Sequence, residues 1–345
     1  PFKEKSKSLN SVVNGFIGAY ILKSMFSQLL FSFATGSMLI NIVLLVMGLV
    51  VVLKGADWLT DGAVNIASRF GVSQMVIGLT IVAMGTSMPE LCVSMVSALK
   101  GTPDLAVGNV VGSNTLNTLL IVGCSALVAP IMVKRSSVRR DIPFAVLASL
   151  LMLIFCLDGG IDRLDAALLF ILFAVFMFVT VKYGKNEGTE AKTTAAPLGK
   201  ATLLLVVGLV CLILGSNLFV DNASFIASTL GVSDAVIGLT IVAGGTSLPE
   251  LATSMVSAKK GNSDIAIGNV IGSNVFNILM IIGVTGLVKP MHIKGITSLD
   301  LIVMLASMLL LWFFCRTTYK VKRWEGAVLA ISYIAYLAWL IAQAV

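Results

Sequence analysis

Long apolar segments separated by short polar ones make up most of the chain after residue 38. A run of about 20 apolar residues is long enough to cross the hydrocarbon core of a bilayer as a helix. The pattern predicts ten such spans, at 39–60, 74–98, 105–129, 142–157, 162–183, 200–224, 234–258, 265–289, 297–315 and 324–344. We therefore predict an all-α polytopic membrane protein.

A stretch of the first half recurs in the second half, 160 residues later and without a gap. Residues 78–91 read GLTIVAMGTSMPEL and residues 238–251 read GLTIVAGGTSLPEL, while GNVVGSNTLN at 108–117 matches GNVIGSNVFN at 268–277. Five spans separate equivalent helices, and because five is odd the two halves should cross the membrane in opposite directions. The chain thus predicts two inverted-topology five-helix repeats, a design in which transporters bind their cargo near the midplane.

The polar segment 184–199 separates the two repeats, which we place at 38–183 and 200–345. Residues 1–37 have no counterpart in the second half and end in Thr35-Gly36-Ser37 before Met38, so we interpret them as a fusion or tag segment that could form an extra helix. Lys and Arg gather in alternate loops. The positive-inside rule then places the linker in the cytoplasm and both native termini outside.

Two prolines, Pro89 and Pro249, interrupt the second and seventh predicted spans. Proline has no N–H to donate and disfavours helical angles at the preceding residue, so these helices should break around 83–88 and 243–248. A carbonyl freed inside hydrocarbon must be satisfied by protein, water or an ion. The breaks therefore mark a candidate binding region in each half.

Each proline is followed by a glutamate, Glu90 or Glu250, and an acid inside a span indicates function by default. Hydroxyl groups share the helix face of each glutamate, and amides and hydroxyls recur at every fourth residue of the following span. These oxygen donors are Thr86, Ser87, Asn109, Ser113, Asn117, Thr246, Ser247, Asn269, Ser273 and Asn277. Neither sulfur nor imidazole accompanies them, and an all-oxygen set suits Ca²⁺ or Na⁺.

Charge counting narrows the chemistry of this candidate site. Two carboxylates close together in a low dielectric cannot both stay ionised unless cations compensate them. One divalent cation or several monovalent ones would do so, and an empty site should take up protons. Because a divalent cation, several monovalent cations or protons would each occupy the site in place of the others, we predict an antiporter in which protons compete with cations.

Composition excludes several other classes of protein. With 57% hydrophobic and 12% charged residues and a mean hydropathy of +1.00, the chain lies outside the range of soluble domains. The net charge of +7 comes from loop residues, and nothing indicates nucleic-acid binding. The five cysteines form no C-x-x-C pair and read as small core residues, and the single histidine, His292, reads as a loop residue. We expect no enzyme and no cofactor. Asp61 and Asp221 read as interfacial caps.

The doubled GTSMPE/GTSLPE and GNVVGSNTLN/GNVIGSNVFN motifs resemble the two alpha repeats of the sodium/calcium exchanger family, within the cation/calcium exchanger superfamily. The resemblance covers nearly all of residues 38–345 and implies one central Ca²⁺ position flanked by several Na⁺ positions. It implies that Glu90 and Glu250 bind Ca²⁺ with the backbone carbonyls of Thr86 and Thr246. It also implies Na⁺ ligands from the side chains of Thr86, Ser87, Ser113, Thr246, Ser247 and Ser273 and the carbonyls of Ala83 and Ala243, with Asn117 and Asn277 lining the centre.

The expected activity is Na⁺/Ca²⁺ antiport in a bacterial or archaeal cell membrane, with a monomer sufficient for transport. Ca²⁺/H⁺ exchange stays open because the same carboxylates could carry protons, although the Ser and Thr stripe favours Na⁺. In the potassium-dependent branch of the family an acid at the position of Asn277 is tied to K⁺ transport, so Asn277 disfavours that branch. A channel would need a continuous polar pore, which a central site between inverted repeats does not provide. The resemblance also implies that spans one and six slide together across the core.

Overall fold

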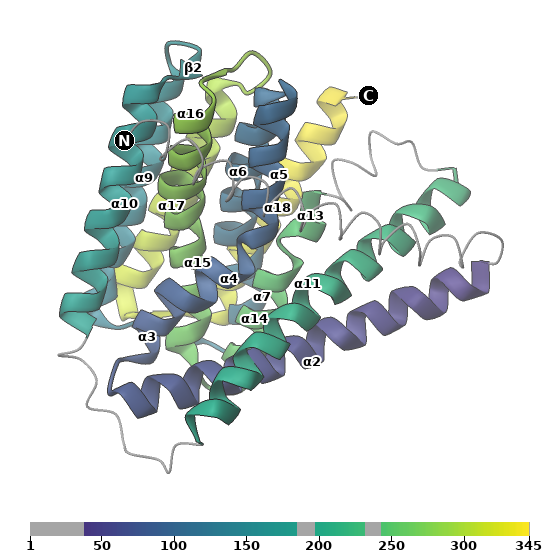
Figure 1. The fold of residues 1–345 in the computed structure, drawn as a ribbon, viewed down its shortest axis with the longest axis vertical. Coiled ribbons are helices and arrows are strands. Elements are labelled where there is room, and N and C mark those ends of the chain that lie inside the picture. Colours follow the sequence, from purple (N-terminus) through teal and green to yellow (C-terminus); the bar gives the residue numbers. More distant parts are fainter. Residues whose placement is uncertain (1–37, 185–196, 232–242, 345) are drawn as a thin grey trace, which may run out of the picture.

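The computed structural model describes residues 38–184, 197–231 and 243–344, and within these ranges the chain is helical apart from four two-residue strands (Figure 1). Among the described residues, seven helices are long and apolar enough to cross a membrane, or eight if the bent pair Gln74–Thr86 and Met88–Lys100 counts as one span. The predicted all-helical membrane class is confirmed. The segment 1–37, most of the linker and the start of the seventh predicted span lie outside the described residues.

The helices follow the predicted spans closely, with π-helical turns (η) inside three of them. The first half contains α2 (Met38–Phe70), α3 (Gln74–Ile77), η1 (Gly78–Val82), α4 (Ala83–Thr86), α5 (Met88–Lys100), α6 (Pro103–Leu116), η2 (Asn117–Ile121), α7 (Val122–Val128), β1 (Ile131–Met132), α8 (Arg135–Arg139), α9 (Asp141–Cys156), β2 (Gly160–Ile161) and α10 (Arg163–Gly184). The second half contains α11 (Leu198–Thr229), α13 (Ala243–Thr246), α14 (Leu248–Lys259), α15 (Ser263–Val275), η5 (Phe276–Ile282), α16 (Gly283–Val288), β3 (Met291–His292), α17 (Ser298–Thr318), β4 (Lys320–Val321) and α18 (Arg323–Ala344).

Two spans form the centre of the molecule. The apolar window of Ser263–Val288 is 94% buried and that of Pro103–Val128 is 78% buried, whereas the windows of the other five long helices are 22–39% buried. Helices α9, α10, α17 and α18 pack around these two (Figure 1). The outer helices expose many large apolar side chains, and because so large an apolar surface is unfavourable in water, we infer that these helices face the bilayer and shield the two polar-rich spans from it.

Both predicted helix breaks are present. The bend between α4 and α5 is 47° and falls at Ser87, whose ψ of 9° departs from helical values. The break between α13 and α14 falls at Ser247, with a ψ of 8°. In each case a proline occupies the first turn of the following helix, where its missing N–H costs no hydrogen bond.

Four short strands, which the hydropathy pattern did not predict, join the two halves. β1 pairs with β4 and β2 with β3, both antiparallel. β1 and β3 begin 160 residues apart, as do β2 and β4, so the two pairings are equivalent under the sequence repeat. His292 lies in β3 opposite Gly160, so the loop position predicted for it was wrong.

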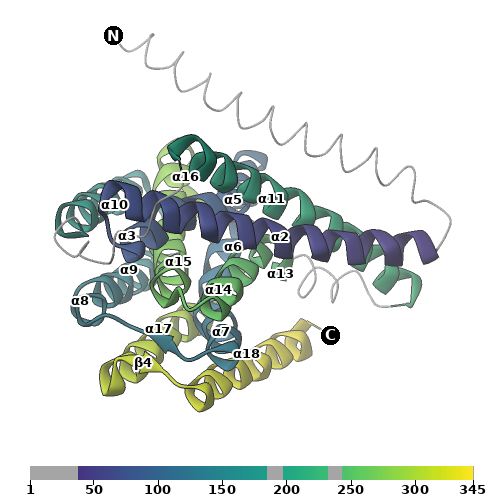
Figure 2. The same cartoon turned by 90° about the horizontal axis from the view of Figure 1, so that it is seen from below.

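Helices α2 and α11 lie side by side and run obliquely across the more upright helices (Figures 1 and 2). Glycines seven residues apart allow their backbones to touch. A Cβ added to Gly208 would lie 2.5 Å from the Leu59 amide nitrogen and 2.7 Å from the Gly55 carbonyl oxygen. Gly62 and Gly215 meet the partner backbone in the same way. Small residues at such a contact are how membrane helices achieve close packing.

The close contact between α2 and α11 predicts that one glycine-to-alanine substitution lowers the stability of the protein, whereas such a substitution in a helix normally raises it. Replacing a helical glycine with alanine normally stabilises a helix by about 1 kcal/mol, but Gly208→Ala should destabilise the protein by about 1–3 kcal/mol because the new methyl group overlaps backbone atoms of α2. The melting temperature of the purified protein in detergent should fall. Gly199→Ala on the same helix is the control, since no described atom lies within 4 Å of its Cβ. Equal melting temperatures for the two variants would contradict a rigid α2–α11 seam.

Candidate functional site

The two predicted glutamates face each other's half of the molecule. Glu90 and Glu250 are both 0% exposed and lie in the first turns of α5 and α14, directly after the breaks. Ser247 donates a hydrogen bond to Glu90 Oε1 at 3.1 Å, and Ser87 donates one to Glu250 Oε1 at 2.9 Å. Each break therefore supplies a hydroxyl to the carboxylate of the other.

Five buried oxygens around this pair have no hydrogen-bond partner among the described residues. They are Glu90 Oε2, Glu250 Oε2, Ser273 Oγ, Asn117 Oδ1 and Asn277 Oδ1. All five belong to residues predicted as ligands. A buried polar atom without a partner costs about 1–3 kcal/mol, more when it is charged, and a cation bound by these oxygens would remove that cost.

Electrostatics support the same conclusion. The ion pairs within the described part of the chain involve neither glutamate. Nor does that part contain a cluster of three or more His, Cys, Asp or Glu side chains, so the donor set is two carboxylates and neutral oxygens. Two negative charges match one divalent cation, and Ca²⁺ accepts six to eight such oxygens.

The remaining predicted ligands lie at the two breaks or, for Ser113, in α6, and several of their atoms already have partners. Ser113 Oγ accepts a hydrogen bond from Ser247 at 3.2 Å. Thr86 Oγ1 lies 3.3 Å from the Ala83 carbonyl and 3.1 Å from Asn269 Oδ1, and the Ala83 carbonyl also accepts the Ser87 N–H. Their equivalents Ala243 and Thr246 begin and end α13. The structure brings these residues together, and their binding to ions stays a prediction.

Two of the amides predicted to face the site instead hold the helices together. Asn109 donates to the Glu90 carbonyl and to Ser94 Oγ, which joins α6 to α5. Asn269 donates to the Glu250 carbonyl and to Ser254 Oγ in the same arrangement. These bonds fix the backbone of each glutamate against the central span.

Sequence reasoning missed a second pair of amides, Asn114 and Asn274. Asn277 Nδ2 donates to Asn114 Oδ1 at 3.0 Å, and Asn117 Nδ2 donates to Asn274 Oδ1 at 3.2 Å. Both residues are at most 3% exposed. Their place beside the serine in the doubled GSN motif was the available signal, but the every-fourth-residue spacing that links Ser113 to Asn117 and Ser273 to Asn277 passes over them.

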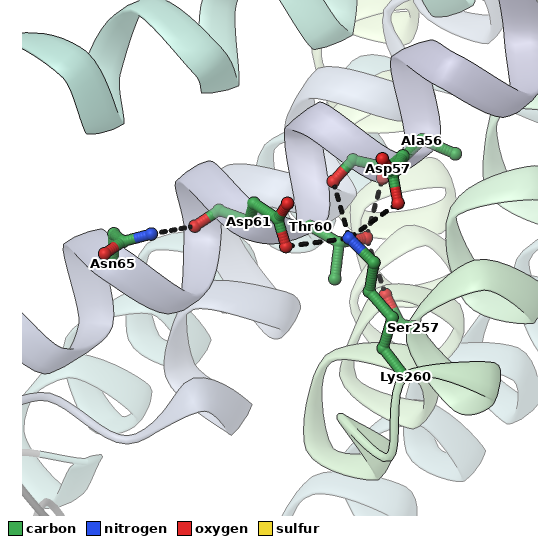
Figure 3. A network of polar contacts seen from close by, with 7 residues as sticks. All are labelled: Ala56, Asp57, Thr60, Asp61, Asn65, Ser257 and Lys260. Atoms are coloured by element: carbon green, nitrogen blue, oxygen red, sulfur yellow. Dashed lines mark hydrogen bonds and ion pairs between the residues drawn. The ribbon is translucent and has the colours of Figure 1, made fainter. Parts of the chain in front are cut away.

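A polar network joins α2 to α14 at one end of the site (Figure 3). Lys260 Nζ lies 2.7 Å from Asp57 Oδ1 and 2.7 Å from Asp61 Oδ1, and Thr60 Oγ1 lies 3.0 Å from Ser257 Oγ. Burial lowers the pKa of Lys260, but the hydrogen bonds and charges of the two aspartates outweigh it and raise this pKa above its ordinary value. Interpreting Asp61 as an interfacial cap was wrong, because α2 continues to Phe70 and the carboxylate binds a lysine instead.

Comparison with known proteins agrees with this geometry. The family model described as sodium/calcium exchanger protein matches twice, over residues 40–182 and 200–342. The chain belongs to the sodium/calcium exchanger family. It is therefore a membrane exchanger that moves cations including Ca²⁺, as the resemblance of its motifs predicted, and its relatives are transporters rather than enzymes.

Individual relatives match this chain over nearly the whole of their own length. The exchanger is 40% identical over 312 residues to the putative antiporter CaxA of Alkalimonas amylolytica, covering 87% of this chain and 98% of the relative. It is 34% identical to the sodium/calcium exchanger MaX1 of Methanosarcina acetivorans, covering 86% and 97%. A solved structure of the sodium-calcium exchanger NCX_Mj, soaked with Na⁺ and Ca²⁺, superposes with a TM-score of 0.77 at 34% identity, covering 87% of this chain and 98% of that one.

Proposed function

We propose that this exchanger moves Ca²⁺ in one direction and Na⁺ in the other through the site between the two helix breaks. The observation that carries the proposal is the set of five buried, partnerless oxygens around Glu90 and Glu250. In this proposal the two glutamates bind Ca²⁺ directly, and the neighbouring hydroxyls, amide oxygens and freed carbonyls complete the shells of Ca²⁺ and Na⁺.

The neutral oxygens favour Na⁺ over H⁺ as the counter-ion. A proton needs only a carboxylate oxygen, whereas Na⁺ needs several ligands at once. Ser273 Oγ, Asn117 Oδ1 and Asn277 Oδ1 are partnerless beside the carboxylates and could serve Na⁺ but would gain nothing from a proton. The relative from Alkalimonas amylolytica is named only as a putative antiporter, which leaves Ca²⁺/H⁺ exchange as the rival.

The repeat geometry supports ten spans in two inverted halves, with a monomer sufficient for transport. The helix breaks at Ser87 and Ser247 and the paired strands all recur at the same 160-residue offset. The distribution of lysines and arginines among the loops favours a cytoplasmic position for the linker and for Lys260. We further propose that α2 and α11, joined by their glycine seam, move as one body across the core to open the site to each side in turn.

Na⁺-driven uptake tests the proposal. Proteoliposomes loaded with Na⁺ and diluted into Na⁺-free buffer should accumulate radioactive Ca²⁺, because Na⁺ leaving down its gradient drives Ca²⁺ inward. Vesicles loaded with K⁺ should not, and neither should vesicles with only a pH gradient. Adding a sodium ionophore should collapse the uptake.

Two results would contradict the proposed Na⁺/Ca²⁺ exchange. Uptake driven by the pH gradient alone would establish the proton-coupled rival. Uptake that required K⁺ together with Na⁺ would place the protein in the potassium-dependent branch, despite Asn277.

A further inference from the structure

We propose that Asn114 and Asn274 are positioning residues, which turn the amide oxygens of Asn277 and Asn117 toward the transported cation. The inference rests on the proposed function, since it assigns a role within the same site. An asparagine amide can present either its oxygen or its nitrogen, and only the oxygen binds a cation. The hydrogen-bond network decides which end each amide presents.

The orientation of Asn114 is fixed by a backbone carbonyl. Its Nδ2 lies 3.1 Å from the carbonyl oxygen of Asn274, and because a carbonyl only accepts hydrogen bonds, the NH₂ end must face it. The Oδ1 end then faces Asn277, 3.0 Å from its Nδ2. Asn277 must offer its NH₂ group to this acceptor, which leaves its Oδ1 for the site.

The orientation of Asn274 is fixed by a different route. The Thr118 hydroxyl donates its only hydrogen to the Asn114 carbonyl at 2.8 Å, so toward Asn274 it can only accept. Asn274 Nδ2 supplies that bond at 2.7 Å. Its Oδ1 therefore faces Asn117 Nδ2, at 3.2 Å, and the amide of Asn117 is turned in the same sense.

These bonds leave the amide oxygens of Asn117 and Asn277 free to bind a cation. Asn117 Oδ1 and Asn277 Oδ1 are buried and have no partner among the described residues. Asn117 follows Ser113 by one helical turn, and Ser113 contacts Ser247, which binds Glu90. These two partnerless oxygens thus lie on the face of the central spans that carries the candidate ion site. Partners that orient a ligand in this way commonly change metal affinity 10–100-fold when removed.

Each positioning side chain accepts a hydrogen bond from an amide of the opposite repeat, Asn114 from Asn277 and Asn274 from Asn117. Neither side chain supplies the bond that orients the other. Asn114 is anchored through the backbone of Asn274, and Asn274 is anchored through Thr118 and the backbone of Asn114. Removing one side chain therefore leaves the other anchored. This crossed arrangement makes the two effects separable.

A double-mutant cycle on Ca²⁺ binding tests the inference. Equilibrium binding of radioactive Ca²⁺ to the purified protein in detergent should weaken about 10-fold in Asn114→Leu, because Asn277 is then free to turn. In an Asn277→Ala background the same change should have no further effect, whereas in Asn117→Ala it should weaken binding by its full factor. Asn274→Leu should show the mirror result, non-additive with Asn117→Ala and additive with Asn277→Ala.

The outcomes are distinct. The positioning role would be overturned by additive effects in Asn114→Leu/Asn277→Ala or in Asn274→Leu/Asn117→Ala, or by wild-type affinity in Asn114→Leu. None of these results would contradict the proposed exchange function. Absence of Ca²⁺ binding by the wild-type protein would overturn the proposed function itself. If Asn114→Leu does not fold, the Asn274→Leu arm decides alone, because it tests the same claim at the other amide.

Discussion

Glu90→Gln and Glu250→Gln should each abolish Na⁺-driven Ca²⁺ uptake. Glutamine keeps the size of the side chain and an oxygen that can accept the bond from Ser247 or Ser87. It removes one of the two negative charges, so a bound Ca²⁺ would carry an uncompensated positive charge in a dehydrated site. Leaving a buried charge uncompensated costs about 3–5 kcal/mol, and at 1.4 kcal/mol per tenfold this lowers Ca²⁺ affinity by a factor of about 100 or more.

Glu325→Gln is the matched control for this loss. Glu325 is also buried, 2% exposed, but it lies at the start of α18 and accepts the Lys322 N–H, far along the chain from either break. Its substitution should leave Ca²⁺ uptake within about twofold of wild type, and melting temperatures should show that all three variants are folded. Sustained uptake by either site variant would remove the carboxylate pair from the mechanism.

The candidate ion site could be predicted from sequence because its residues form local patterns in the chain. Proline before glutamate inside an apolar run is visible in one span, and its recurrence at a fixed offset supplies the second half. The structure places Glu90 and Glu250 at the breaks and buries both. The prediction was possible because a buried acid and a broken helix both cost much free energy, so a Pro-Glu pair within an apolar span does not arise by chance.

The contacts between distant segments could not be predicted in the same way. Nothing around Gly208 specifies that its partner is Leu59 in α2, and the bond between Lys260 and Asp57 links residues in different repeats. Asn114 was missed because a spacing argument assigns residues to one helix face, whereas its amide reaches across to Asn277 from an adjacent position. Such pairings depend on how helices cross, which hydrophobic periodicity does not encode.

The contact between α2 and α14 must break if α2 and α11 move as one body. Thr60 and Ser257 are hydrogen-bonded at 3.0 Å, and Lys260 binds both aspartates of α2 beside them (Figure 3). The residues equivalent to this contact at the 160-residue offset are Ser97, Lys100, Asn217, Val220 and Asp221, and Lys100 makes no ion pair with the described residues. The structure holds α2 against α14 at the Lys260 end, which in the orientation proposed above is the cytoplasmic one.

Cross-linking Thr60→Cys to Ser257→Cys should stop exchange completely, and a reducing agent should restore it, because a disulfide holds its two residues within a few ångströms. The double variant is made in a background without the five native cysteines, and each single variant treated with the same oxidant is the control. Val220→Cys with Ser97→Cys should form its disulfide only when the opposite end closes, and should block exchange equally. Normal Ca²⁺ uptake by fully cross-linked Thr60→Cys/Ser257→Cys protein would show that α2 stays fixed on α14 during transport, and alternating access would then require a different moving part.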